Sequence, residues 1–164
     1  MPVPDPSPLA FTPRFRPDGS LDPACLDRLV VRPEDVGAYQ WWYFDGLSDD
    51  GRFGFVAIYF VGGVFSALYA DRIAAGVPAS PFDHPMVNLA LYDRAKQVGW
   101  VFSEHPREKL SVDDPELSIR IGGSSVSRRD GRYELVVEDR DYPRNRPVSA
   151  RITLVPDAQG LVPP

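Results

Sequence analysis

Apolar and polar residues alternate along most of the chain from residue 40 onward. Between residues 86 and 93, Val87, Leu89 and Leu91 form one purely apolar face. A period of two residues is typical of β-strands that bury one side. The pattern predicts strands at residues 40–47, 52–61, 64–70, 86–92, 98–104, 117–121, 124–128, 133–139 and 148–155.

Turn residues separate these runs and indicate hairpins. Asp50-Gly51 and Asp130-Gly131 each lie between two apolar runs, which is a strong short-range hairpin signal. Gly62-Gly63 interrupts the longest apolar run. With eight or nine strands and almost no helix, the sequence predicts an all-β fold: an antiparallel meander curled into a barrel or half-barrel.

The strand at residues 55–61 is apolar on both faces. Phe55, Ala57, Tyr59 and Val61 alternate with Val56, Ile58 and Phe60. Both faces must therefore be covered. We expect one face to pack in the core and the other to line a cavity or to meet a second domain. Apolar walls with a few aromatic and amide groups would suit an apolar ligand.

The length of 164 residues indicates one domain, and 18 prolines with 13 glycines favour short elements over long helices. We expect a proline-rich leader over residues 1–38, with a short helical turn at Leu26, Leu29 and Val30. A β-domain would follow over residues 39–156, and a tail over residues 157–164. The leader does not resemble a secretory signal, so we expect a cytoplasmic protein.

Charge and cysteine content exclude some classes of function. The net charge of −5 disfavours nucleic acid as a partner. A single cysteine, Cys25, cannot form an intramolecular disulfide. His84 and His105 lie outside any metal-ligand spacing, so we expect solvated loop histidines and no metal. No nucleotide-binding glycine motif occurs either, and we expect no cofactor.

The segment Gln40–Gly46 contains four consecutive aromatic residues followed by Asp45. Alternation places Trp42 and Phe44 on one face and Trp41, Tyr43 and Asp45 on the other. One interpretation is an aromatic wall that stabilises a developing cation, with a buried Asp45 as proton donor. The other is a core strand that closes a barrel, in which Asp45 accepts turn hydrogen bonds before Gly46.

Three segments carry a resemblance to a known family: YQWWYFDGLSDDGRFGFVAIYFVGGVFSALYA, HPMVNLALYDRAKQVGWVFSE and LSIRIGGSSVSRRDGRYELVVED. In this order they resemble the N-terminal half of the carotenoid 1,2-hydratases, also called hydroxyneurosporene synthases, within a wider lipocalin-like superfamily. The similar region runs from about Tyr39 to about Val155. The resemblance implies two lipocalin-like β-domains with an apolar pocket.

The resemblance also implies a cofactor-free lyase reaction, in which water adds to the terminal C1–C2 double bond of an acyclic carotenoid such as neurosporene or lycopene. Protonation by a general acid would give a tertiary carbocation that water captures. In the family, the proton-donating Asp lies in the C-terminal half, in HxW-type and GYxDxN-type segments that are absent here. No catalytic residue is carried over, and Asp45 stays a candidate by its position alone.

Three hypotheses follow from this departure. The chain is a hydratase component that lacks the acid, a non-catalytic module that binds an apolar terpenoid, or a structural half that forms a homodimer. A second lipocalin-like domain and the membrane in which a carotenoid resides are the further partners that the resemblance implies.

The candidate ligand contacts lie on the mixed faces of three central strands: Trp42, Tyr59, Asn88 and Tyr92. Trp41, Tyr43 and Asp45 are the candidates if the opposite face lies inside. With Tyr59 in a cavity, Tyr59→Ala is expected to weaken polyene binding with little loss of stability.

Overall fold

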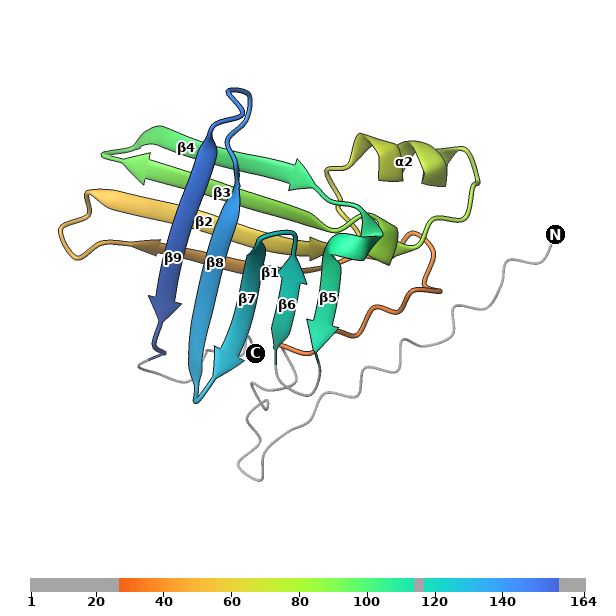
Figure 1. Cartoon of the computed structure of the whole chain (residues 1–164), viewed down its shortest axis with the longest axis horizontal. Coiled ribbons are helices and arrows are strands. Elements are labelled where there is room, and N and C mark those ends of the chain that lie inside the picture. The colour runs from red at the N-terminus through yellow and green to blue at the C-terminus, as the bar shows by residue number, and fades with distance from the viewer. Residues whose placement is uncertain (1–26, 114–116, 157–164) are drawn as a thin grey trace, which may run out of the picture.

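The computed structural model describes residues 27–113 and 117–156, which form two antiparallel sheets (Figure 1). The four-stranded sheet has the order β1 (Gln40–Leu47), β2 (Phe53–Val61), β3 (Met86–Asp93) and β4 (Lys96–Glu104). The five-stranded sheet has the order β5 (Leu110–Asp113), β6 (Ser118–Ile121), β7 (Ser124–Arg129), β8 (Arg132–Arg140) and β9 (Pro147–Leu154). Short helices are α2 (Ala67–Ala74), η1 (Pro81–Asp83) and η2 (Arg107–Lys109).

The two sheets pack face to face with their strands crossing, and the core lies between them (Figure 1). The four-stranded sheet contributes Tyr59, Val87 and Leu89, and the five-stranded sheet contributes Ile119 and Leu135. A bridge between Val101 and Asp141 joins the sheets on one side, next to β4. No closed barrel forms among the described residues, so the predicted all-β antiparallel fold is confirmed in its half-barrel form.

The predicted Asp-Gly hairpin between β7 and β8 is confirmed. Asp130 and Gly131 both have positive φ, of 49° and 75°. This is the conformation of the tight hairpin turn whose twist matches that of the flanking strands. The register follows directly, with Arg129 paired to Arg132.

One predicted element is wrong. Residues 64–70 were expected as a strand, but Ser66 caps a helix there by accepting a hydrogen bond from the Tyr69 backbone N–H. A short apolar run is compatible with the period of a helix and with that of a strand. The Ser66 cap therefore decides in favour of the helix. The structure also adds β5, a strand that was not among the predicted ones and that pairs with β6.

Residues 27–39 run along the body as bends and turns, and Leu26, where the predicted helical turn would begin, lies outside the described residues. Val31 is buried in the core, and the Gln40 side-chain oxygen accepts the backbone N–H of Val30 at 2.8 Å. Cys25, the rest of the predicted leader and the tail over residues 157–164 lie outside the described residues. Within residues 27–113 and 117–156, the helices are too short and too polar to cross a membrane.

Candidate functional site

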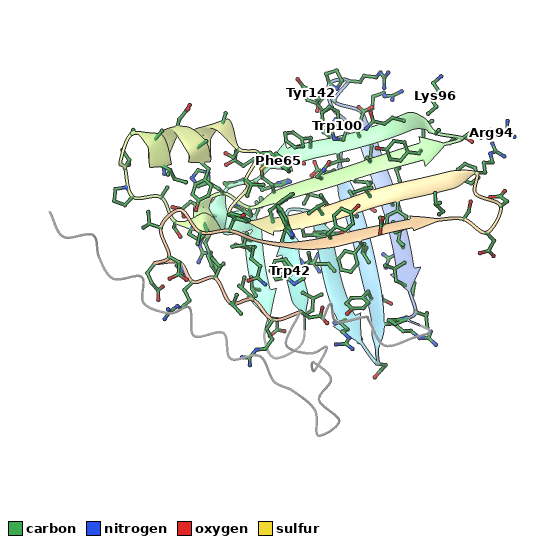
Figure 2. All side chains as sticks on the ribbon, turned by 180° about the vertical axis from the view of Figure 1, so that it is seen from behind. Trp42, Phe65, Arg94, Lys96, Trp100 and Tyr142 are labelled. Atoms are coloured by element: carbon green, nitrogen blue, oxygen red, sulfur yellow. The ribbon has the colours of Figure 1, made fainter. Side chains whose placement is uncertain are left out.

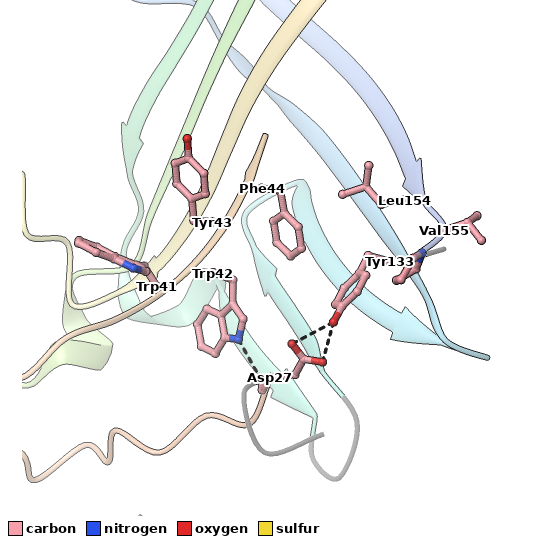
Figure 3. A pocket seen from close by; sticks show the side chains of 9 residues that line it. Asp27, Trp41, Trp42, Tyr43, Phe44, Tyr133, Leu154 and Val155 are labelled. Atoms are coloured by element: carbon pink, nitrogen blue, oxygen red, sulfur yellow. Dashed lines mark hydrogen bonds between the residues drawn. The ribbon is translucent and has the colours of Figure 1, made fainter. Parts of the chain in front are cut away.

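An open crevice of about 500 Å³ lies beside the edge strand β1 (Figure 3). This volume falls within the range of small-molecule sites, about 300–1,000 Å³. The crevice is mainly aromatic and aliphatic, with one carboxyl group at its base. Its lining residues are Asp27, Trp41, Trp42, Tyr43, Phe44, Tyr133, Leu154, Val155 and Pro156.

Strand alternation in β1 builds one wall of the crevice. Trp42 and Phe44 point toward Asp27 and Tyr133, whereas Trp41 and Tyr43 leave the other side of the strand (Figure 3). The ring of Phe44 contacts that of Tyr133 on β8, with 5.4 Å between centroids. Because β1 pairs only with β2 among the named strands, its second edge stays open toward the crevice.

Asp27 is tied to both sheets. The Tyr133 hydroxyl donates to its two carboxylate oxygens at 3.3 and 3.0 Å, and the Arg128 guanidinium donates at 3.0 Å. The Trp42 indole N–H donates to the backbone oxygen of Asp27 at 3.0 Å. The carboxylate therefore acts as an acceptor that anchors residues 27–39 to β7 and β8.

Burial changes the proton affinity of this pair. Burial raises the pKa of Asp27 above its usual value, and the hydrogen bond from Tyr133 and the charge of Arg128 only partly offset it. Burial and the neighbouring Asp27 charge together raise the pKa of Tyr133 to about 12. Tyr133 thus remains a hydrogen-bond donor at neutral pH.

The raised pKa of Asp27 predicts a pH dependence of stability. A group with a folded pKa above its unfolded value contributes stability that is complete below 3.8 and is lost as the pH rises through the folded pKa. As the pH rises from 3.8 through the folded pKa of Asp27, we expect wild type to lose stability relative to Asp27→Asn. Urea unfolding at a series of pH values measures the difference, and parallel curves for the two proteins would contradict the prediction.

The four candidate ligand contacts do not share a face. Trp42 and Tyr59 lie on the inner face and are 5% and 0% exposed, whereas Asn88 and Tyr92 lie on the outer face of the same sheet. The Tyr59 hydroxyl donates to the backbone oxygen of Val136 at 3.0 Å. Tyr59 is thus a core residue between the sheets, and the expectation that its removal would hardly affect stability is corrected. Of the four, only Trp42 lines the crevice.

The alternative candidates project from the opposite side of β1. Trp41 and Tyr43 are 49% and 53% exposed, and both line the crevice at its rim. Asp45 is exposed on the same outer face. The burial that the proton-donor interpretation of Asp45 assumed is not observed, and Asp45 does not line the crevice.

The two histidines are not the solvated loop residues that we expected. His84 is 2% exposed, stacks on Tyr69 and places Nδ1 2.6 Å from Glu104. His105 places Nε2 2.9 Å from Asp139. Both histidines thus join strand ends to their neighbours, and no cluster of three metal-ligating side chains occurs within residues 27–113 and 117–156.

Sequence reasoning missed Asp27 and Tyr133 as site residues. They are separated by 106 positions, so no local spacing could join them. Asp27 also falls inside the region that was expected to form a leader. The available signal was the unusual run of aromatic residues at 41–44, which forms one wall of the crevice.

The chain is similar in sequence to two curated proteins of one kind. The chain is 36% identical over 140 residues to an acyclic carotenoid 1,2-hydratase of Thiocapsa roseopersicina, over 85% of this chain and 33% of that protein. It is 39% identical over 133 residues to an acyclic carotenoid 1,2-hydratase of Rubrivivax gelatinosus, over 77% and 31%. The chain is related to the acyclic carotenoid 1,2-hydratases.

The matched region covers only part of the length of these hydratases. The chain spans about a third of the length of these two relatives, consistent with the resemblance to their N-terminal half. A hydroxyneurosporene dehydrogenase of Chlorobaculum tepidum is 26% identical over 140 residues, over 80% of this chain and 36% of that protein. No protein-family model matches the chain. The search of solved structures likewise gave no match.

Proposed function

We propose that this chain is the apolar-ligand-binding part of a carotenoid hydratase-like protein. The crevice beside β1 is the observation that carries the proposal, because aromatic walls surround it and it is open to solvent. One end of an acyclic carotenoid would enter between Trp42, Phe44 and Leu154. The kinship with two acyclic carotenoid 1,2-hydratases supports this choice of ligand.

The reaction that the proposal assigns to the whole protein needs no cofactor. A general acid transfers a proton to one carbon of the terminal C1–C2 double bond, which leaves a tertiary carbocation on the other carbon. Water attacks that carbon and then releases a proton, so that the net change is the addition of one water molecule. Aromatic faces such as those of Trp42 and Phe44 would stabilise the cation.

We place the catalytic acid outside this chain. Asp27 is the only carboxyl group among the residues that line the crevice, and it already accepts hydrogen bonds from Tyr133 and Arg128. Burial raises the pKa of Asp27, but Tyr133 and Arg128 engage both of its carboxyl oxygens, so we assign this group to anchoring and not to proton transfer. A second β-domain, which the family resemblance implies, would supply the acid from the two thirds of the relatives that lie outside the match.

The test is to incubate the purified chain with lycopene in detergent and to measure bound polyene and hydroxylated product. We expect binding without product, and about tenfold weaker binding by Leu154→Arg, because the variant places an unpaired charge in an apolar wall. Leu47→Arg is the matched control, since Leu47 is 78% exposed at the end of β1 and does not line the crevice.

The outcomes separate a hydratase component from a non-catalytic binding module. Product formed when the unmatched part of the Rubrivivax gelatinosus hydratase is added would support a hydratase component. Binding without product under any condition would favour a non-catalytic binding module. Product from the chain alone would contradict our placement of the catalytic acid outside this chain. Absence of any lycopene binding would overturn the proposed function.

A further inference from the structure

A continuous row of aromatic rings crosses the outer face of the four-stranded sheet. We call it the aromatic band, and its rings in order are Trp41, Phe60, Phe65, Phe102, Trp100 and Tyr142. Neighbouring centroids are 5.3–6.0 Å apart. This spacing lies within the range for interacting aromatic pairs. Figure 2 shows Phe65, Trp100 and Tyr142 on this side of the molecule.

The rings of the band are held in place by their surroundings. Phe60 is 0% exposed, with Trp41 and Phe65 in edge contact with its ring. The Trp100 indole N–H donates to the Asn88 side-chain oxygen at 3.0 Å. The Tyr142 backbone N–H donates to the Trp100 carbonyl at 2.7 Å, which fixes the β8–β9 loop beside β4. The band is therefore a preorganised surface.

Much of the band is nevertheless open to solvent. Trp41, Phe65 and Tyr142 are 49%, 56% and 56% exposed. The outward positions of β2 and β3 beneath it are the apolar Ile58, Met86 and Ala90, of which Met86 and Ala90 are buried. The charged groups on the same face are Asp45 on β1 and Glu104 at the end of β4. Exposed apolar patches of this kind mark sites of interaction. The occupant of the rings themselves must offer a long apolar surface.

The band begins at the crevice. Trp41 lines the crevice rim and is also the first ring of the band. From there the band crosses β2 to β4 and ends at the loop after β8, a width of about 14 Å for three strand spacings. A ligand whose end lies in the crevice can therefore continue over the sheet from one ring of the band to the next.

We propose that the aromatic band binds the extended chain of a linear polyene, an inference that rests on the proposed function. A polyene is flat, long and uncharged, and it presents a continuous π-surface to successive rings. A row of rings matches this shape better than it matches a compact apolar molecule. The crevice would hold one end of the ligand, and Phe65, Phe102 and Trp100 would contact its length.

The experiment compares a long and a short acyclic isoprenoid, lycopene and geraniol, on the full chain in detergent. Trp100→Ala removes the ring furthest along the sheet from the crevice. We expect it to weaken lycopene binding by about tenfold and to leave geraniol binding unchanged, because only the long ligand reaches β4. Phe65→Ala, at an exposed position, should have the same selectivity, and Trp100→Phe should restore most of the lycopene affinity.

Leu47→Ala is the matched control, since Leu47 lies on the outer face of β1 but outside the band. Unchanged lycopene binding by both Trp100→Ala and Phe65→Ala would overturn the inference and leave the proposed function intact. Equal weakening of geraniol and lycopene would also overturn it, because the rings would then not discriminate by length. Failure of wild type to bind either ligand would overturn both proposals.

Discussion

Tyr59→Ala should destabilise the protein by about 3–5 kcal/mol, the range for large aromatic side chains removed from a core. Tyr59 is 0% exposed and lies between the two sheets, where its neighbours cannot readily fill the space that its ring leaves. The variant also leaves the backbone oxygen of Val136 without its hydroxyl partner. Chemical denaturation of wild type and variant measures the loss.

Two companion variants separate the contributions. Tyr59→Phe keeps the ring and removes only the hydrogen bond, so we expect a loss of about 1–3 kcal/mol. Tyr43→Ala removes an equally large side chain that is 53% exposed, and should cost much less than Tyr59→Ala. A near-neutral Tyr59→Ala with weakened polyene binding would restore the earlier interpretation of Tyr59 as a ligand contact.

Gly62→Ala should destabilise the protein by about 2–5 kcal/mol, the sum of a backbone and a packing penalty. Gly62 has a φ of +77°, a conformation that residues with a Cβ rarely adopt. A Cβ there would also lie 2.5 Å from the carbonyl oxygen of Ala38 and 3.0 Å from Pro81. The segment before β1 would therefore have to move away from the end of β2.

Gly76→Ala is the matched control for this prediction. Gly76 has a similar φ of +67°, but a Cβ there would meet nothing within 4 Å. It should therefore show only the backbone penalty, about 1–2 kcal/mol. Equal losses for the two variants would show that the close approach of Ala38 to β2 relaxes without cost, and the packing part of the argument would be wrong.

The crevice and the aromatic band give β1 two roles at once. Its inward residues Trp42 and Phe44 form a wall beside Asp27, and its outward residue Trp41 begins the row of rings on the opposite face. Both roles follow from a single unbroken aromatic run in an edge strand. An edge strand so poor in charge would be prone to aggregation if it stayed bare. A ligand or a further domain over β1 would relieve this exposure.

Most strands could be predicted from the sequence because their signals are local. Alternation in the run 86–93 depends only on which residues are neighbours, and the Asp130-Gly131 turn fixes the hairpin between β7 and β8. The alternation of β1 was also predicted correctly, with Trp42 and Phe44 opposite Trp41 and Tyr43. The helix at Ser66 was missed because its cap is a single hydrogen bond, invisible to a periodicity of apolar residues.

The candidate site was less accessible to sequence reasoning than the fold. Strand alternation divides residues into two faces, but it does not say which face is inside when both are apolar. The five-stranded sheet decides this by packing on Tyr59 and Trp42, which leaves Asn88 and Tyr92 outside. The burial of His84 likewise depends on Tyr69 and Glu104, which come from other elements.

The sequence by itself thus determined an all-β, antiparallel chain with an aromatic strand at residues 40–47, and its kinship with carotenoid hydratases. Only the tertiary structure decided that the sheets of the described residues stop short of a barrel, that Asp27 meets Tyr133, and that six rings form one band. The physical reason is how far apart along the chain the interacting residues lie. Alternation and turns are set by adjacent residues, whereas a crevice or a row of rings depends on the packing of strands far apart along the chain.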